Sequence, residues 1–152
     1  MNKRGKSGKA STRAMLLPPT ADSVRELSLR YHLALAALRS GEGNGYLLSE
    51  LIRVLYVAWY LHEDGYGRPA AGLFADAEEA LDRSASRATR DDAWYLEPRE
   101  CAAVEKLLAL HDEQLQQASI KAMLAVQKRL AHFARSDKRA PWQKGGRAAA
   151  SA

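Results

Sequence analysis

Residues 98–135 carry a helical repeat of apolar side chains that no glycine or proline interrupts after Pro98. Spacings of three and four residues place them on one face of an α-helix. A single helix of this length would extend about 57 Å, against about 27 Å for 18 residues. We expect either a break near residues 111–119 or a projecting half that needs a partner, most simply in a homodimer. The repeat comprises Val104, Leu108, His111, Leu115, Ala118, Ala122, Val126, Leu130 and Phe133.

Three shorter helices are predicted before this segment. Residues 21–39 follow Thr20 or Asp22 as N-cap, and Leu29, Leu33 and Ala36 widen the apolar stripe enough for two buried neighbours. Residues 46–62 are apolar in nearly every direction, which is typical of a central, buried helix. Residues 71–88 carry acids early and arginines late, as the helix dipole favours.

The predicted fold is all-α: an antiparallel four-helix bundle with a long C-terminal helix and disordered basic tails. The chain has 152 residues and is 47% hydrophobic, which suffices for one core. Alanine, leucine, glutamate and arginine dominate, and they favour helix over sheet. We divide the chain into a basic N-terminal tail at 1–19, a helical body at 20–135 and a basic C-terminal tail at 136–152.

Cysteine usage and hydropathy predict a cytoplasmic protein without a membrane segment. Cys101 is the single cysteine, so the chain has no internal disulfide and suits a reducing compartment. The basic N-terminus lacks the apolar core of a secretory signal, because residues 14–17 are followed directly by Pro18. The longest apolar stretch, residues 51–61, is interrupted by Arg53 and is too short to span a bilayer.

Charge is distributed unevenly along the chain. Residues 1–21 and 135–152 together carry net +9, which leaves −4 in residues 22–134 of a chain whose net charge is +5. Basic ends on an acidic body indicate a polyanionic partner such as DNA. Basic residues around an aromatic ring can bind phosphates and stack on a base; the alternative is solubilising tails. The candidate nucleic-acid-binding residues are Lys3, Arg4, Lys6, Lys9, Arg13, Lys128, Arg129, Arg135, Lys138, Arg139, Trp142, Lys144 and Arg147.

No catalytic or metal-binding motif occurs, and we expect no enzyme activity, no cofactor and no metal. The four histidines lack the Glu-x-x-His and His-x-x-x-His spacings of helical metal sites. The tyrosines of residues 56–66, with His62 and Glu63, could line a ligand pocket, but aromatics in this position usually form the core and its rim. Residues 83–90 have side chains suited to a DNA-reading helix, without the short turn and supporting helix that a helix-turn-helix requires.

A family resemblance rests on Leu27–Leu35, the glycine-rich loop, Val54–Leu61 and Gly65–Gly67. These segments resemble short helical bacterial proteins that are labelled Fis-family transcriptional regulators. The resemblance covers under half of the chain, in positions of the core type, and implies DNA binding and gene regulation. True Fis proteins end in a helix-turn-helix with a basic recognition helix, which this chain lacks, so no site residue is transferred.

Two function hypotheses follow. The first is a regulatory protein that binds DNA or another polyanion through its basic ends, as a homo-oligomer joined by the long fourth helix. The alternative is a helical protein–protein interaction module with no role on nucleic acid. Salt distinguishes them, because counterion release makes phosphate binding collapse with added salt whereas apolar docking persists.

Overall fold

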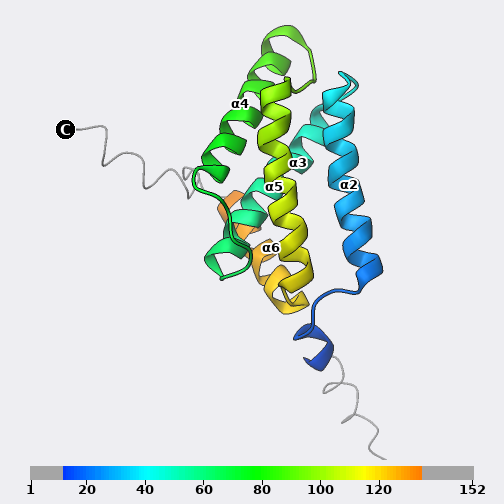
Figure 1. The fold of residues 1–152 in the computed structure, drawn as a ribbon, viewed down its shortest axis with the longest axis vertical. Coiled ribbons are helices and arrows are strands. Elements are labelled where there is room, and N and C mark those ends of the chain that lie inside the picture. The colour runs from blue at the N-terminus through cyan, green and yellow to red at the C-terminus, as the bar shows by residue number, and fades with distance from the viewer. Residues whose placement is uncertain (1–11, 135–152) are drawn as a thin grey trace, which may run out of the picture.

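The computed structural model describes residues 12–134, and every regular element in that range is a helix (Figure 1). Figure 1 shows α4, α5 and α2 side by side, with α3 running obliquely behind them. The helices are α2 (Ala21–Arg39), α3 (Gly45–Glu63), α4 (Leu73–Asp91), α5 (Pro98–Gln117) and α6 (Ile120–Ala134). The chain is therefore all-α in the described range, as predicted. A helical turn at residues 12–15 and an extended stretch to residue 20 precede α2, and we call residues 12–20 the N-terminal strap.

Helix α3 is the central element. It packs against α2, α4, α5 and α6, and its buried side chains lie on several faces. Leu48, Leu51, Val54, Leu55 and Leu61 are each at most 3% exposed. The prediction of a central helix at residues 46–62 is thus confirmed. Among the helices α2–α6, α3 therefore packs against each of the others.

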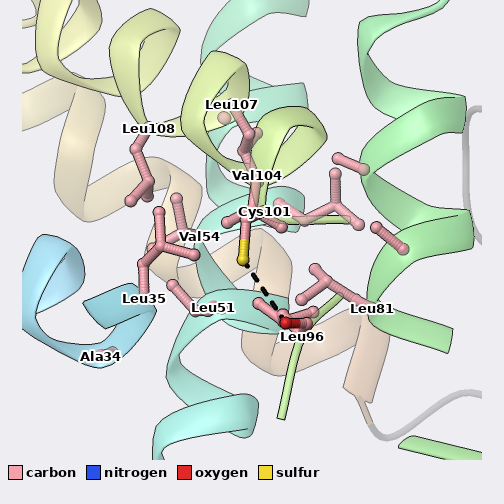
Figure 2. Packing of buried hydrophobic residues seen from close by; sticks show 14 of the residues in the cluster. Ala34, Leu35, Leu51, Val54, Leu81, Leu96, Cys101, Val104, Leu107 and Leu108 are labelled. Atoms are coloured by element: carbon pink, nitrogen blue, oxygen red, sulfur yellow. Dashed lines mark hydrogen bonds between the residues drawn. The ribbon is translucent and has the colours of Figure 1, made fainter. Parts of the chain in front are cut away.

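The main core lies between α2, α3, α4 and α5. Figure 2 shows Leu35 of α2, Leu51 of α3 and Leu81 of α4 converging on Val104 of α5. The loop before α5 also contributes, because the Leu96 backbone N–H donates to Leu38 O at 3.0 Å. Leu96 itself is 3% exposed and so anchors this loop in the core. Loss of one such leucine would cost about 2–5 kcal/mol through transfer and cavity terms.

A second, smaller apolar cluster joins α3 to α6. Val57, Tyr60 and Leu61 of α3 are buried with Ala118 and Val126. Met123 and Leu130 of α6 pack around this cluster. The cluster is distinct from the main core, so α6 packs beside that core rather than within it.

The apolar repeat of residues 98–135 is divided between two helices, and the break at Ala118 and Ser119 lies within residues 111–119, where we expected it as one of two alternatives. Ala118 is extended at φ −73°, ψ 136°, and the Ser119 hydroxyl accepts a hydrogen bond from the Ala122 N–H at 3.1 Å. The bend turns the apolar side chains of α6 onto α3. A straight helix would have carried them into solvent, at a cost set by the apolar area left exposed. The projecting half from which we expected a homodimer is therefore absent.

The outer face of α2 differs from the prediction. Leu29 and Leu33 are each 59% exposed, and Ala36 is also exposed. Helix α2 packs against α3 and α5 on one side only, through Ala34, Leu35 and Leu38. Two neighbours therefore share one face of α2, and the widened stripe stays at the surface.

The loop between α3 and α4 is fastened to α5. Gly67 has φ +75°, and a Cβ atom there would lie 2.7 Å from Leu110 Cδ1 and 3.0 Å from Gln114 Cγ. Both the left-handed backbone and this close approach require glycine. The Gln114 side-chain amide donates to Tyr66 O at 3.2 Å and to Ala58 O at 2.8 Å. Gln114 thus joins α5 to both α3 and the loop.

Candidate polyanion-binding surface

Helix α6 is the cationic helix of the described chain. It carries Lys121, Lys128, Arg129 and His132 and contains no acidic residue, whereas each of the other described helices contains at least two. Lys121, Lys128 and His132 are exposed. The positive charge of α6 therefore faces water rather than the core.

The exposed face of α6 is fixed by its apolar face. Val126 is fully buried against α3, so residues on the opposite side of the helix point outward. Lys121 and Lys128 are seven residues apart, or two turns, which places them on the same side about 10 Å apart. Leu124 lies between them and is 48% exposed. The two lysines thus form a short row on the surface.

The charge of Arg129 is already paired within the protein. Its guanidinium pairs with Glu63 at 2.8 Å and with Asp64 at 3.1 Å. The same group lies 4.4 Å from the centre of the Tyr60 ring. Burial raises the pKa of Tyr60, and Arg129 partly opposes that rise. Two carboxylates already neutralise this arginine, so it is a weaker phosphate ligand than the exposed Lys128 on the same helix.

The N-terminal strap meets α6 at its first residue. The carbonyl of Leu17 accepts a hydrogen bond from the Ile120 N–H at 2.9 Å. Arg13 lies four residues before Leu17, in the helical turn of the strap, and is exposed. Residues 1–11 therefore join the described chain near the start of α6, and residues 135–152 follow its end. The strap thus contacts the start of a cationic helix about 22 Å long.

The remaining candidates fall outside the described residues. Of the predicted set, Arg13, Lys128 and Arg129 are described, and the structure places the last two on α6. Lys121, which the same row contains, completes the exposed pair. The candidates that lie outside are Lys3, Arg4, Lys6, Lys9, Arg135, Lys138, Arg139, Trp142, Lys144 and Arg147.

The arginines in the second half of α4 are already paired. Arg83 bonds Glu79, and Arg90 bonds its neighbour Asp91. Arg87 is buried against Glu100. These contacts leave little of the charge that a DNA-reading helix would need, in agreement with the missing helix-turn-helix.

Ser28, His32 and Asp112 form a polar cluster between α2 and α5 that sequence spacing did not reveal. The Ser28 hydroxyl donates to Asp112 Oδ1 at 2.7 Å, and His32 Nε2 lies 2.9 Å from Asp112 Oδ2. The serine and the histidine thus both bond the carboxylate, whereas a nucleophilic serine must bond the histidine that accepts its proton. The cluster therefore acts as a tie between helices. The described residues contain no group of three or more histidine, cysteine, aspartate or glutamate side chains that could hold a metal ion.

The aromatic residues at the end of α3 are taken up in packing. Tyr56 lies against Phe133, with ring centres 5.3 Å apart. Trp59 meets Phe74 edge to face at 5.1 Å, and His62 lies 5.7 Å from the same ring. This is the core-and-rim arrangement that we weighed against a ligand pocket.

Burial of His111 predicts an acid-sensitive fold. His111 is 1% exposed and pairs through Nδ1 with Gln114 Oε1 at 3.2 Å. Burial lowers the pKa of His111 below its ordinary value, although Gln114 and Asp112 oppose that shift. The unfolded state therefore binds the proton more readily, so stability is full above about pH 6.5 and falls as the pH drops towards the folded pKa.

We expect His111→Asn to flatten this dependence by up to about 1.4 kcal/mol per pH unit as the pH falls below about 6.5. Urea unfolding at several pH values measures it. An equal slope in wild type and His111→Asn would show that another group titrates.

No protein-family model, curated protein or solved structure matches this chain in the comparisons. The Fis-family resemblance therefore stays a prediction. Among the described residues, no helix is both long enough and apolar enough to cross a membrane.

Proposed function

We propose that the protein binds DNA or a similar polyanion along the exposed face of α6, together with the basic residues at both ends of the chain. The helices α2–α5 serve as the bundle that holds this surface. Cationic side chains on phosphates supply affinity without a sequence-reading motif. The proposed role in the cell is regulatory.

One observation carries the proposal: the Leu17–Ile120 hydrogen bond, which places the N-terminal strap at the start of α6. Without it, the basic residues of the sequence would be two unrelated ends. With it, Arg13 lies four residues from the strap's contact with α6, the helix that carries the exposed Lys121 and Lys128, and Arg135 follows that helix in the sequence. A polyanion is a linear array of charges, so a linear array of cations complements it.

A charge-removal pair tests the surface. We expect Lys121→Gln with Lys128→Gln in the full chain to weaken binding to labelled duplex DNA about 10-fold at 50 mM salt, and to flatten the salt slope by about 2. Fluorescence anisotropy measures both quantities. The matched control is Arg99→Gln with Lys106→Gln, exposed residues of α5 that have the same spacing and the same charge loss. Equal effects of the two pairs would show that only net charge matters, and no binding by wild type would reject the proposal.

The alternative, a protein–protein interaction module, is favoured by the outer face of α2. Leu29 and Leu33 are one turn apart and both 59% exposed, an apolar pair with no partner helix among the described residues. Binding through this face should persist in high salt and be lost in Leu29→Ser with Leu33→Ser. The Lys121 and Lys128 substitutions should leave it intact.

A further inference from the structure

The hinge between α5 and α6 contains no residue that forbids a helix. Residues 116–120 read Gln-Gln-Ala-Ser-Ile, without glycine or proline. The apolar spacing of Leu115, Ala118 and Ala122 continues across the hinge in helical register. The bend therefore depends on what α6 packs against, and a straight α5–α6 helix is the local alternative.

Contacts with α3 hold α6 in its bent position. They consist of the small apolar cluster around Val126, the Arg129 ion pairs with Glu63 and Asp64, and a hydrogen bond from Arg53 to Gln127. The ion pairs are half-exposed and therefore weak individually. Release of α6 would leave the main core intact but would expose Val57, Tyr60 and Leu61, and this apolar face would need a new cover.

The N-terminal strap opposes straightening. In a continuous helix the Ile120 N–H would donate to the carbonyl of Gln116, four residues earlier. In the structure it donates to Leu17 O instead. The Ser119 hydroxyl likewise caps the Ala122 N–H, which a continuous helix would satisfy through Ala118 O. The strap and the serine cap thus stabilise the bent form against the straight one.

We propose that two copies of this chain form a dimer by exchanging α6. Ala118 and Ser119 become helical, and each α6 covers Val57, Tyr60 and Leu61 of the second copy. A second copy is the fitting occupant because its α6 has the shape and charge that this face of α3 already binds, including Arg129 for Glu63. All contacts of α6 with α3 recur in the dimer, so the hinge and the strap's bond to Ile120 decide the balance.

A matched pair of hinge variants tests the proposal. Ser119→Ala and Ser119→Gly both remove the capping hydroxyl, but alanine favours the continuous helix and glycine opposes it. Because each dimer contains two hinges, the dimer association constant should be about 30-fold larger for alanine than for glycine. Light scattering after gel filtration of the full chain, over a range of concentrations, measures it. Equal association constants would overturn the proposal, as would monomers at every concentration.

Charge reversal separates exchange from any other dimer. In the Ser119→Ala background, one copy carries Glu63→Lys and the other Arg129→Glu. In an exchanged heterodimer the two reversed charges face each other at one site, and the native pair forms at the other. Heterodimers should therefore exceed the statistical half in native mass spectra of the mixture, whereas a dimer that keeps its own α6 would give half and contradict the proposal. If Ser119→Ala does not fold, the wild-type hinge at high concentration gives the same comparison. None of these readouts depends on polyanion binding, so the proposed function and the exchange can fail separately.

Discussion

Replacing Glu100 by alanine should lower the free energy of unfolding by about 3–5 kcal/mol, because it removes the main counter-ion of a buried arginine and leaves only Glu97, 3.8 Å away. Glu100 is 4% exposed, and both of its carboxylate oxygens bond the guanidinium of Arg87. Arg87 also donates to Tyr95 O at 3.1 Å and lies over the Tyr95 ring. Its Nε already lacks a hydrogen-bond partner within the described part of the chain. Loss of the carboxylate would leave this charge poorly compensated.

Urea unfolding followed by circular dichroism measures the effect. Glu79→Ala is the matched control, since it breaks the exposed pair with Arg83 on α4 and should cost below about 1 kcal/mol. Arg87→Met with Glu100→Leu should recover most of the stability, because an apolar pair of similar volume carries no desolvation cost. A double variant as unstable as Glu100→Ala would show that packing around these residues, not charge, is responsible.

Gln114→Leu should lower the free energy of unfolding by about 2–4 kcal/mol. The Gln114 side chain is fully buried, donates to Tyr66 O and Ala58 O, and accepts from the ring of His111. Leucine has a similar volume, so the expected loss comes from buried polar groups that remain without partners, each costing about 1–3 kcal/mol. Tyr66 O and His111 Nδ1 are the groups affected most, since Ala58 O lies inside a helix.

Gln117→Leu is the control on the same helix. Gln117 is exposed and accepts a hydrogen bond from the Gly67 N–H at 3.3 Å, so its loss should cost below about 1 kcal/mol. Both variants go through the same urea titration. Equal losses in the free energy of unfolding would mean that several residues of α5 contribute to binding the 64–72 loop, rather than Gln114 alone.

The sequence predicted a helix end well where a capping residue or a proline next to that end determines it. The bounds expected for α2, residues 21–39, match the structure, and Thr20 caps it by accepting from the Ser23 N–H at 3.3 Å. Pro98 begins α5 as predicted. Caps and first-turn prolines act within four residues, so a sequence contains all that they require.

The break between α5 and α6 was within the range that the sequence allowed, but its place could not be derived from residues 111–119 alone. Ser119 is a good N-cap, yet serine also occurs inside helices. What decides the bend is the apolar face of α3 and the carbonyl of Leu17, both distant in the sequence. The exposure of Leu29 and Leu33 also depends on packing between distant segments, because an apolar stripe does not determine how many neighbouring helices cover it.

The candidate surface was half predicted. The basic residues at the chain ends, with Lys128 and Arg129, were evident from the sequence, but the pairing of Arg129 with Glu63 and Asp64 was not. The contact between the strap and α6 could not be predicted either, because a hydrogen bond between backbone groups does not depend on which side chains are present. The buried pair of Arg87 with Glu100 escaped detection for a related reason: both are ordinary residues of amphipathic helices.

The Leu17–Ile120 bond has a consequence for the chain during its synthesis. A ribosome releases the strap first, but the strap's partner on α6 emerges only after α2, α3, α4 and α5 have left the exit tunnel. The main core can therefore assemble on the growing chain while the strap and the outer face of α3 wait uncovered. During this interval Val57, Tyr60 and Leu61 are open to α6 of a neighbouring nascent chain on the same messenger. When α6 docks, it therefore covers the apolar face of α3 and bonds the strap in the same step, although the strap was synthesised first.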